Sequence, residues 1–265
     1  MQKLYIIKVG GNIIDNPEAL ESFLHDFASL KENKILVHGG GKVATEISKG
    51  LGIEAQMVDG RRITDAETLK IVTMVYGGLI NKNIVAKLQA NECNAIGLTG
   101  ADANIMLSSK RPVKNGVDYG FVGDVEKIHP QPLIHLLSQG ITPVIAPLTH
   151  DGKGNILNTN ADTVASELAV SLSSGFVVNL VYCFELKGVL RDINDKDSVI
   201  SDINPDTYAQ LKAEGIINKG MIPKLDNSFN AISAGVSSVI ICQAESLTEL
   251  INDKRAVGTK LVASY

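Results

Sequence analysis

Two clusters of lysine and glycine stand at the ends of apolar runs, where they could bind a phosphate group. The first cluster is Lys8-Val9-Gly10-Gly11, which follows the apolar residues 4–7. Lysine carries a compact positive charge, and glycine lets backbone N–H groups approach a ligand closely. The pattern indicates either a site for a phosphate in transfer or a surface lysine before a turn.

The second cluster is His38-Gly39-Gly40-Gly41-Lys42, which lies between an expected strand and an expected helix. The first-turn N–H groups of a helix lack internal partners, and the helix dipole favours an anion beside them. Neither cluster has the Gly-x-Gly-x-x-Gly order of a dinucleotide fingerprint or the order of a phosphate loop. We therefore expect an anion site here, with a ligand-free turn as the alternative.

Paired arginines follow in the segment 59–65, which reads Asp-Gly-Arg-Arg-Ile-Thr-Asp. A guanidinium binds a carboxylate as a two-pronged fork. We expect one of Arg61 and Arg62 to bind a carboxylate and the other to be solvated. Thr64 or Asp65 can cap the helix that follows.

A third group of candidates lies near two further helix starts. Alternation along an extended segment puts Asn158 and Asn160 on one side, and Asp162 then falls in the first turn of a helix. Asp162 is either a helix-start residue or a carboxylate that holds nearby lysines. Lys224 lies early in another expected helix, where the dipole disfavours a cation, so we expect it to have an anionic partner.

The remaining polar residues give weaker signals. Gly188 follows another apolar run and could open a nucleotide pocket at the end of that strand. His38 is expected to pack, and the other histidines to be structural or exposed. Cys93, Cys183 and Cys242 lie in or after apolar stretches, so buried reduced thiols are expected. No metal-ligand spacing is present, so no metal site is expected.

The composition argues against several classes of protein. The chain has 265 residues and a formal net charge of −4, and this charge disfavours non-specific nucleic-acid binding. No window approaches the ~18 apolar residues of a membrane-spanning helix. The apolar run begins directly after Lys3 and leaves no room for a signal peptide. We therefore expect a cytoplasmic protein that binds neither nucleic acid nor a membrane.

Strand-like and helix-like segments alternate along the chain. This alternation predicts an α/β fold with an open, mainly parallel central sheet sandwiched by helices, and with ligands at the carboxyl ends of the strands. Residues 104–127 break the rhythm and indicate antiparallel hairpins, and the turn residues 151–155 are expected to cap another hairpin. A boundary near 173–175 would give two lobes, 1–174 and 175–265. Expected strands lie at 4–9, 34–38, 93–98, 141–146, 176–181 and 238–242, and expected helices at 17–31, 42–51, 65–89, 131–139, 161–172, 205–214 and 221–234.

In order and spacing, these motifs resemble those of the amino acid kinase family, from Lys8 to about Lys260. The resemblance implies that family's αβα sandwich and the ATP-dependent phosphorylation of the γ-carboxylate of N-acetyl-L-glutamate to N-acetylglutamyl 5-phosphate, in arginine biosynthesis. It also implies a homodimer in which the first lobe binds the acylglutamate and dimerises while the second binds the nucleotide. The segments that carry the resemblance are 8–11, 38–41, 60–64, 158–162 and 220–224.

The resemblance also implies a role for each matching residue. Lys8 and Lys224 would stabilise the transition state, and Asp162 would orient them. Gly10 and Gly11 would line the phosphate path. The acylglutamate would be bound by Gly40, Gly41, Arg62, Asn158 and Asn160, and the nucleotide by Glu185, Gly188, Lys219 and Gly220 together with Gly10 and Gly11.

One departure from the family pattern affects the nucleotide site. Where the family has Asp-Val-x-Gly, this chain has Glu-Leu-Lys-Gly at 185–188, preceded by the unusual Tyr182-Cys183-Phe184. The longer glutamate and the added lysine leave the contacts to adenine and ribose open. The departure does not touch the phosphate chemistry.

Phosphorylation of a carboxylate suits this set of residues. A glutamate side chain, with a reference pKa of about 4.3, is ionised at neutral pH and needs no general base. The difficulty is the approach of two anions, which lysines, glycine N–H groups and a magnesium ion carried by the ATP phosphates would ease. Alternatives are a kinase for another N-acylglutamate such as N-succinylglutamate, a kinase for carbamate, glutamate or uridylate, and a non-catalytic sensor. A nicotinamide dehydrogenase is a remote fourth.

Overall fold

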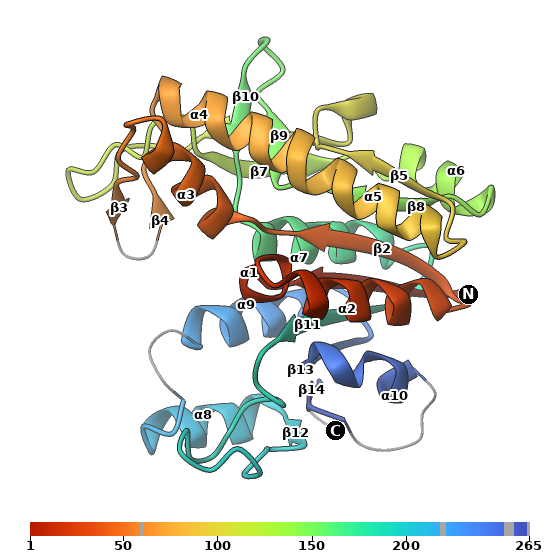
Figure 1. Ribbon diagram of the computed structural model, residues 1–265. Coiled ribbons are helices and arrows are strands. Elements are labelled where there is room, and N and C mark those ends of the chain that lie inside the picture. Colours follow the sequence, from red (N-terminus) through yellow and green to blue (C-terminus); the bar gives the residue numbers. More distant parts are fainter. Residues whose placement is uncertain (59–60, 218–220, 252–256, 264–265) are drawn as a thin grey trace.

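The computed structural model describes residues 1–58, 61–217, 221–251 and 257–263. Its centre is an eight-stranded sheet with the order β12-β14-β13-β11-β1-β2-β8-β5 (Figure 1). All neighbours in this sheet pair in parallel except β13 and β14, which are antiparallel. The strands are β1 (Lys3–Val9), β2 (Asn33–His38), β5 (Ala95–Leu98), β8 (Thr142–Ile145), β11 (Val177–Phe184), β12 (Asp202–Ile203), β13 (Ser238–Gln243) and β14 (Thr259–Leu261).

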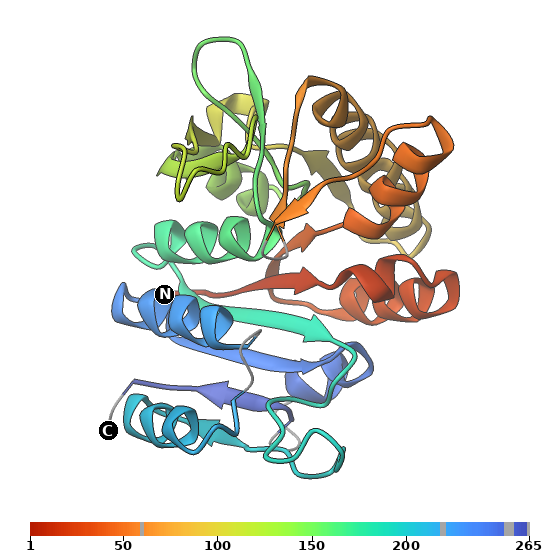
Figure 2. The ribbon, with the colours of Figure 1, turned by 90° about the vertical axis from the view of Figure 1, so that its left-hand side faces the viewer.

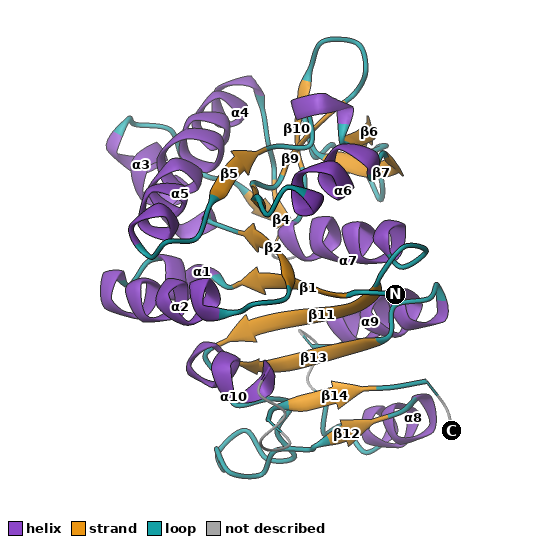
Figure 3. Ribbon diagram, turned by 90° about the vertical axis from the view of Figure 1, so that its right-hand side faces the viewer, coloured by secondary structure: helices purple, strands orange, loops and turns teal. Residues whose placement is uncertain are grey.

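Helices cover both faces of this sheet, as Figures 2 and 3 show for α7 and α9 on one side and α2 on the other. The expected α/β sandwich is confirmed. One face carries α1 (Gly11–Ile14), α2 (Pro17–Ser29), α3 (Gly41–Gly50), α4 (Ala66–Val72), α5 (Asn81–Ala90) and α10 (Leu247–Ile251). The other face carries α6 (Gln131–Ser138), α7 (Ala161–Leu172), α8 (Pro205–Ala213) and α9 (Ile222–Ser233).

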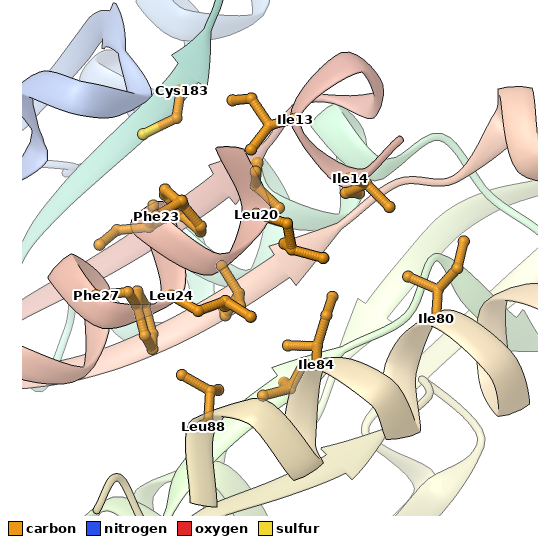
Figure 4. Packing of buried hydrophobic residues seen from close by; sticks show 14 of the residues in the cluster. Ile13, Ile14, Leu20, Phe23, Leu24, Phe27, Ile80, Ile84, Leu88 and Cys183 are labelled. Atoms are coloured by element: carbon orange, nitrogen blue, oxygen red, sulfur yellow. The ribbon is translucent and has the colours of Figure 1, made fainter. Parts of the chain in front are cut away.

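The alternation of side chains along β1 divides the core into two apolar clusters. Tyr5, Ile7 and Val9 pack toward α2 and α5, whereas Leu4 and Ile6 pack toward α7 and α9. Figure 4 shows the first cluster, in which the apolar side chains of α2 face those of α5. Each face of β1 is therefore buried, which explains the continuous apolar run in the sequence.

Smaller sheets are formed within residues 57–158. One has four strands in the order β10-β9-β6-β7, and the other is the two-stranded β3–β4. The antiparallel β6–β7 pair confirms the hairpin expected in 104–127, and β9–β10 confirms the one expected around 151–155. The strands are β3 (Met57–Val58), β4 (Arg61–Arg62), β6 (Met106–Lys110), β7 (Gly123–Ile128), β9 (Leu148–His150) and β10 (Ile156–Asn158).

Several elements differ from the sequence expectation. The helix expected at 65–89 runs through α4 and α5 but is π-helical over Thr73–Ile80, where two adjacent glycines weaken the α-helical preference. The strand expected at 176–181 continues to Phe184, because β1 and β13 pair with it on both sides. The strands β3, β4, β12 and β14 have two or three residues each, too few for a periodic signal.

Other expectations about the chain hold in the structure. The three cysteines are free and buried, as expected. His38 is fully buried, which agrees with a packing role. Among the residues described, no helix is both long and apolar enough to cross a membrane.

Candidate active site

Three charged side chains meet on the α7 face of the sheet. Lys8 is the second-last residue of β1 and follows the same alternation as Leu4 and Ile6, so its side chain emerges on that face. Asp162 lies in the first turn of α7, and Lys224 in the first turn of α9. The sheet thus brings Lys8 together with residues that are more than 150 positions away in the sequence.

Asp162 forms ion pairs with both lysines. Its Oδ1 lies 2.8 Å from Lys8 Nζ, and its Oδ2 lies 3.5 Å from Lys224 Nζ. The side chain of Asn160 caps α7 by accepting hydrogen bonds from the backbone N–H groups of Asp162 and Thr163. The expected anionic partner of Lys224 is therefore Asp162.

Burial and charge together set the protonation of this triad. Burial raises the pKa of Asp162, but the charges of Lys8 and Lys224 outweigh it and hold this pKa below its ordinary value. Burial also lowers the pKa of Lys224, against the opposing effect of Asp162. With both amines protonated, the triad carries two positive charges and one negative charge.

A cavity of about 460 Å³ opens beside the triad. It joins residues from the glycine cluster, the arginine segment and the asparagine segment, which the sequence places far apart. Of the residues singled out from the sequence, the cavity is lined by Gly40, Gly41, Arg62, Asn158, Asn160, Asp162 and Lys224.

Arg62 is buried in the wall of this cavity. Its Nη2 donates hydrogen bonds to the Gly41 carbonyl at 2.8 Å and to Thr45 Oγ1 at 2.6 Å. Its Nη1 is buried and has no hydrogen-bond partner within the described ranges. Asn158 lies nearby, and its Nδ2 donates to Thr64 Oγ1 at 3.0 Å. Two hydrogen bonds thus fix one side of the guanidinium, and the N–H groups of Nη1 have no partner among the described residues.

Gly40 shapes the entrance to α3. Its φ of +145° belongs to a region that side chains rarely adopt, and a Cβ there would lie 2.2 Å from Ile80 Cδ1. The glycine therefore lets α3 begin at the edge of the cavity, with its first N–H groups near the ligand space.

Gly10 and Gly11 follow the end of β1, next to the end of β11. The Gly10 N–H donates to the Cys183 carbonyl at 3.0 Å, and a Cβ at Gly11 would meet open space. The side-chain amide of Asn12, just after β1, donates a hydrogen bond to Glu185, just after β11. Gly10, Gly11 and Glu185 are thus brought together at the carboxyl ends of the two central strands.

The other nucleotide candidates are Gly188, Lys219 and Gly220. Gly188 packs against Thr259, whose Oγ1 would lie 2.7 Å from an added Cβ, so this glycine allows a close approach to β14. Lys219 and Gly220 lie outside the described residues.

Several cavity residues were not found from the sequence. Tyr76, Arg111, Tyr182 and Asn227 also line the cavity. Tyr182 pairs in register with Lys8 across two parallel strands that both end at the site, and the spacing of the sequence does not show which strands are neighbours. Arg111 lies in the region of antiparallel hairpins, where nothing in the sequence shows which way its side chain points.

Comparisons with known proteins agree with this architecture. Residues 3–243 match the model of the amino acid kinase family. The chain is 88% identical to the acetylglutamate kinase of Cytophaga hutchinsonii over 100% of both chains, and 63% identical to that of Phocaeicola vulgatus over 94% of this chain and 96% of the relative. The fold is similar to the crystal structure of smu.665 from Streptococcus mutans, with a TM-score of 0.78, 24% identity and coverage of 98% and 99% of the two chains. The chain therefore belongs to the amino acid kinase family.

Proposed function

We propose that this protein is an acetylglutamate kinase, which transfers the γ-phosphoryl group of ATP to the γ-carboxylate of N-acetyl-L-glutamate in arginine biosynthesis. The observation that carries the proposal is the pair of ammonium groups on Asp162 at the edge of a cavity that also contains Arg62. The full-length likeness to relatives with this name supports it.

The triad has the charge that this reaction requires. The attacking carboxylate and the transferring phosphoryl group are both anionic, and catalysis consists mainly of positioning and charge neutralisation. Lys8 neutralises the transferring group, Lys224 acts on the leaving side, and Asp162 holds both amines in place. Gly10 and Gly11 line the phosphate path with backbone N–H groups.

The cavity provides the complementary contacts for the acylglutamate. The free Nη1 of Arg62 binds the α-carboxylate, and the start of α3 at Gly40 and Gly41 supplies backbone N–H donors to the anion. Asn158 binds the end of the acylglutamate that carries the acylated nitrogen, and Asn160 fixes the start of α7 beside it.

The nucleotide binds from the side of β11, with Glu185, Gly188, Lys219 and Gly220 as its contacts. Mg²⁺ is expected to arrive on the ATP phosphates and to stabilise their charge when bound. Across the described part of the chain, no group of three or more His, Cys, Asp or Glu side chains could hold a metal ion, and Asp162 already faces two amines. We therefore expect phosphate oxygens and water to be the main ligands of the metal.

The proposed assembly is a cytoplasmic homodimer with an acylglutamate lobe at 1–174 and a nucleotide lobe at 175–265. The exposed apolar side chains of Met74, Leu79 and Ile96 support a contact between copies, because two lie on the π-helical segment and the third on the edge strand β5. Light scattering after gel filtration tests the dimer.

A kinase for an N-acylglutamate with a further carboxylate, such as N-succinylglutamate, is the second candidate. Arg111 favours it, because this second arginine lines the same cavity and is fixed by Asp124, which accepts from its Nε and Nη2. A succinyl group would bring a carboxylate that a fixed guanidinium can bind, whereas an acetyl group would not.

An assay with hydroxylamine decides among these candidates. The full chain is incubated with ATP, Mg²⁺ and either N-acetyl-, N-succinyl- or free glutamate, and the acyl phosphate is trapped as its hydroxamate. We expect ATP-dependent hydroxamate from an acylglutamate and none from free glutamate. If neither acylglutamate gives a product while ATP still binds, the protein is a sensor and the proposal is wrong.

A further inference from the structure

Two aromatic side chains at the end of β11 lie beside the charged triad. Tyr182 and Phe184 are two positions apart, so both point to the α7 face of the sheet. Their ring centroids are 6.2 Å apart and the planes differ by 7°, which is a stacked arrangement. These residues belong to the segment that departs from the family pattern.

The ring of Phe184 faces both lysines of the triad. Lys224 Nζ lies 3.8 Å from the ring centroid, and Lys8 Nζ lies 5.4 Å from it. Both distances fall within the ~6 Å range in which an ammonium ion is attracted to the negative face of an aromatic ring. One ring therefore contacts the two amines that Asp162 also holds.

The triad poses an electrostatic problem that such a ring can solve. Two ammonium groups on one carboxylate repel each other, and both are largely removed from water. A second carboxylate in direct contact with both amines would stabilise them but would cancel the charge that the phosphoryl group needs. An aromatic face stabilises a cation without cancelling its charge, and it leaves the N–H donors to turn toward phosphate oxygens.

We propose that Phe184 is a positioning residue for phosphoryl transfer, whose ring holds the ammonium groups of Lys8 and Lys224 together while preserving their positive charge. The inference rests on the proposed function. Tyr182 stacks on this ring, and its hydroxyl donates to the backbone carbonyl of Asp162 at 3.3 Å. The aromatic pair thus connects β11 to the start of α7.

The proposal has a consequence for the titration of Lys224. Its amine is faced by Asp162 from α7, by Lys8 from β1 and by Glu185 from the segment after β11. Asp162 and Glu185 favour the charged amine, and Lys8 and burial disfavour it. Because the ring also favours the charged form, its replacement by an aliphatic side chain should lower the pKa of Lys224 further.

The test compares Phe184→Leu with Phe184→Tyr, which keeps the ring. Phe176→Leu is the matched control, because Phe176 is also partly buried against the same apolar cluster but lies just before the start of β11, at the far end of the strand. For Phe184→Leu we expect kcat to fall about 3- to 30-fold, with the KM for the acylglutamate within about twofold of wild type. In the pH profile of kcat, the fall on the alkaline side should occur about half to one pH unit lower than in the wild type.

Phe184→Tyr should keep the wild-type kcat and the wild-type pH profile of kcat. Phe176→Leu should change neither of them. A titration of the lysine side chains by NMR, with ε-¹³C-labelled lysine and no substrate, measures the pKa of Lys224 directly. This measurement separates the inference from the proposed function, because it does not depend on turnover. If Phe184→Leu, or Phe184→Met where the leucine variant fails to fold, leaves the pKa of Lys224 unchanged, the inference is overturned.

Discussion

At the residue scale, the site depends on one carboxylate that serves two amines. Asp162 is placed by the cap that Asn160 provides to α7, and it reaches Lys8 and Lys224 with separate oxygens. The depressed pKa of Asp162 means that the carboxylate stays ionised at neutral pH. The two lysines can therefore remain charged and close together before any phosphate arrives.

Replacement of Lys8 by alanine tests the charge that this residue supplies. We expect kcat for acyl phosphate formation to fall about 10²- to 10³-fold, the usual loss for one well-placed donor in a water-poor site. The melting temperature should change little, because Asp162 keeps Lys224 as a partner. The exposed Lys49→Ala is the control. Normal turnover in Lys8→Ala would show that Lys8 does not supply charge to the transferring phosphoryl group.

Replacement of Arg111 by methionine separates the two acyl candidates. If Arg111 binds a distal carboxylate, the KM for N-succinylglutamate should rise about tenfold or more, since hydrogen bonds to charged groups contribute about 1.5–3 kcal/mol. The KM for N-acetylglutamate should stay within about twofold. The control is Lys110→Met, because Lys110 is the neighbouring residue and its amine pairs with Asp118. Equal effects on both substrates would rule out an acyl contact by Arg111.

At the element scale, strand ends and helix starts converge on the cavity. The glycine cluster joins β2 to α3, and the π-helical segment presses against it, with Ile80 beside Gly40 and Tyr76 in the cavity wall. π-helical turns are often found at functional sites because they redirect side chains. Here the redirected side chains leave room for no residue larger than glycine at position 40.

Replacement of Gly40 by alanine should disturb the acylglutamate site through α3. The added Cβ would clash with Ile80 Cδ1, and the backbone would need to leave its φ of +145°. We expect a loss of about 2 kcal/mol in the free energy of unfolding. The KM for the acylglutamate should rise at least about tenfold, with a smaller change in the KM for ATP.

The control for this change lies at the other end of the same helix. A Cβ at Gly50 would meet nothing within 4 Å, so Gly50→Ala should leave the kinetics unchanged and the stability equal or higher. Urea unfolding and steady-state kinetics of both variants provide the measurements. Equal kinetics for the two variants would contradict the assigned role of Gly40.

The sequence predicted those parts of the site that lie at the junctions of long elements. Lys8, Gly40 and Asp162 stand where a strand ends or a helix begins, and both periodicity and helix capping locate such points. Phe184 and Arg111 could not be found in this way. Their importance depends on which strands are neighbours and on the direction of a side chain within a short hairpin, and neither is encoded in local spacing.

At the scale of the whole molecule, one continuous sheet links the two halves of the chain. β1 from the first half lies between β11 and β2, so the first strand of the sequence occupies the centre of the sheet (Figure 3). Apolar clusters on both faces fix this strand. The lysine and glycines at its end are thus mounted on the most enclosed part of the fold, as a preorganised site requires.

The same burial makes the stability of the molecule depend on pH through His38. This side chain is fully buried at the end of β2, where Nε2 accepts a hydrogen bond from Asn81 and Nδ1 donates one to the Gly39 carbonyl. Burial lowers its pKa from 6.5 to about 4, despite the bond to Gly39. The neutral form is therefore the one that the fold holds.

Between pH 6.5 and about 4 an unfolded chain binds a proton at this histidine and the folded protein largely does not, so acid favours unfolding. The contribution of His38 is fully present above pH 6.5 and is lost between pH 6.5 and about 4, for a total of about 3 kcal/mol. Urea unfolding at a series of pH values should show this loss in the wild type and a flatter profile in His38→Gln. His25→Gln replaces an exposed histidine of α2 and controls for the loss of any histidine. If His38→Gln loses stability with acid as steeply as the wild type, the acid sensitivity arises elsewhere in the molecule.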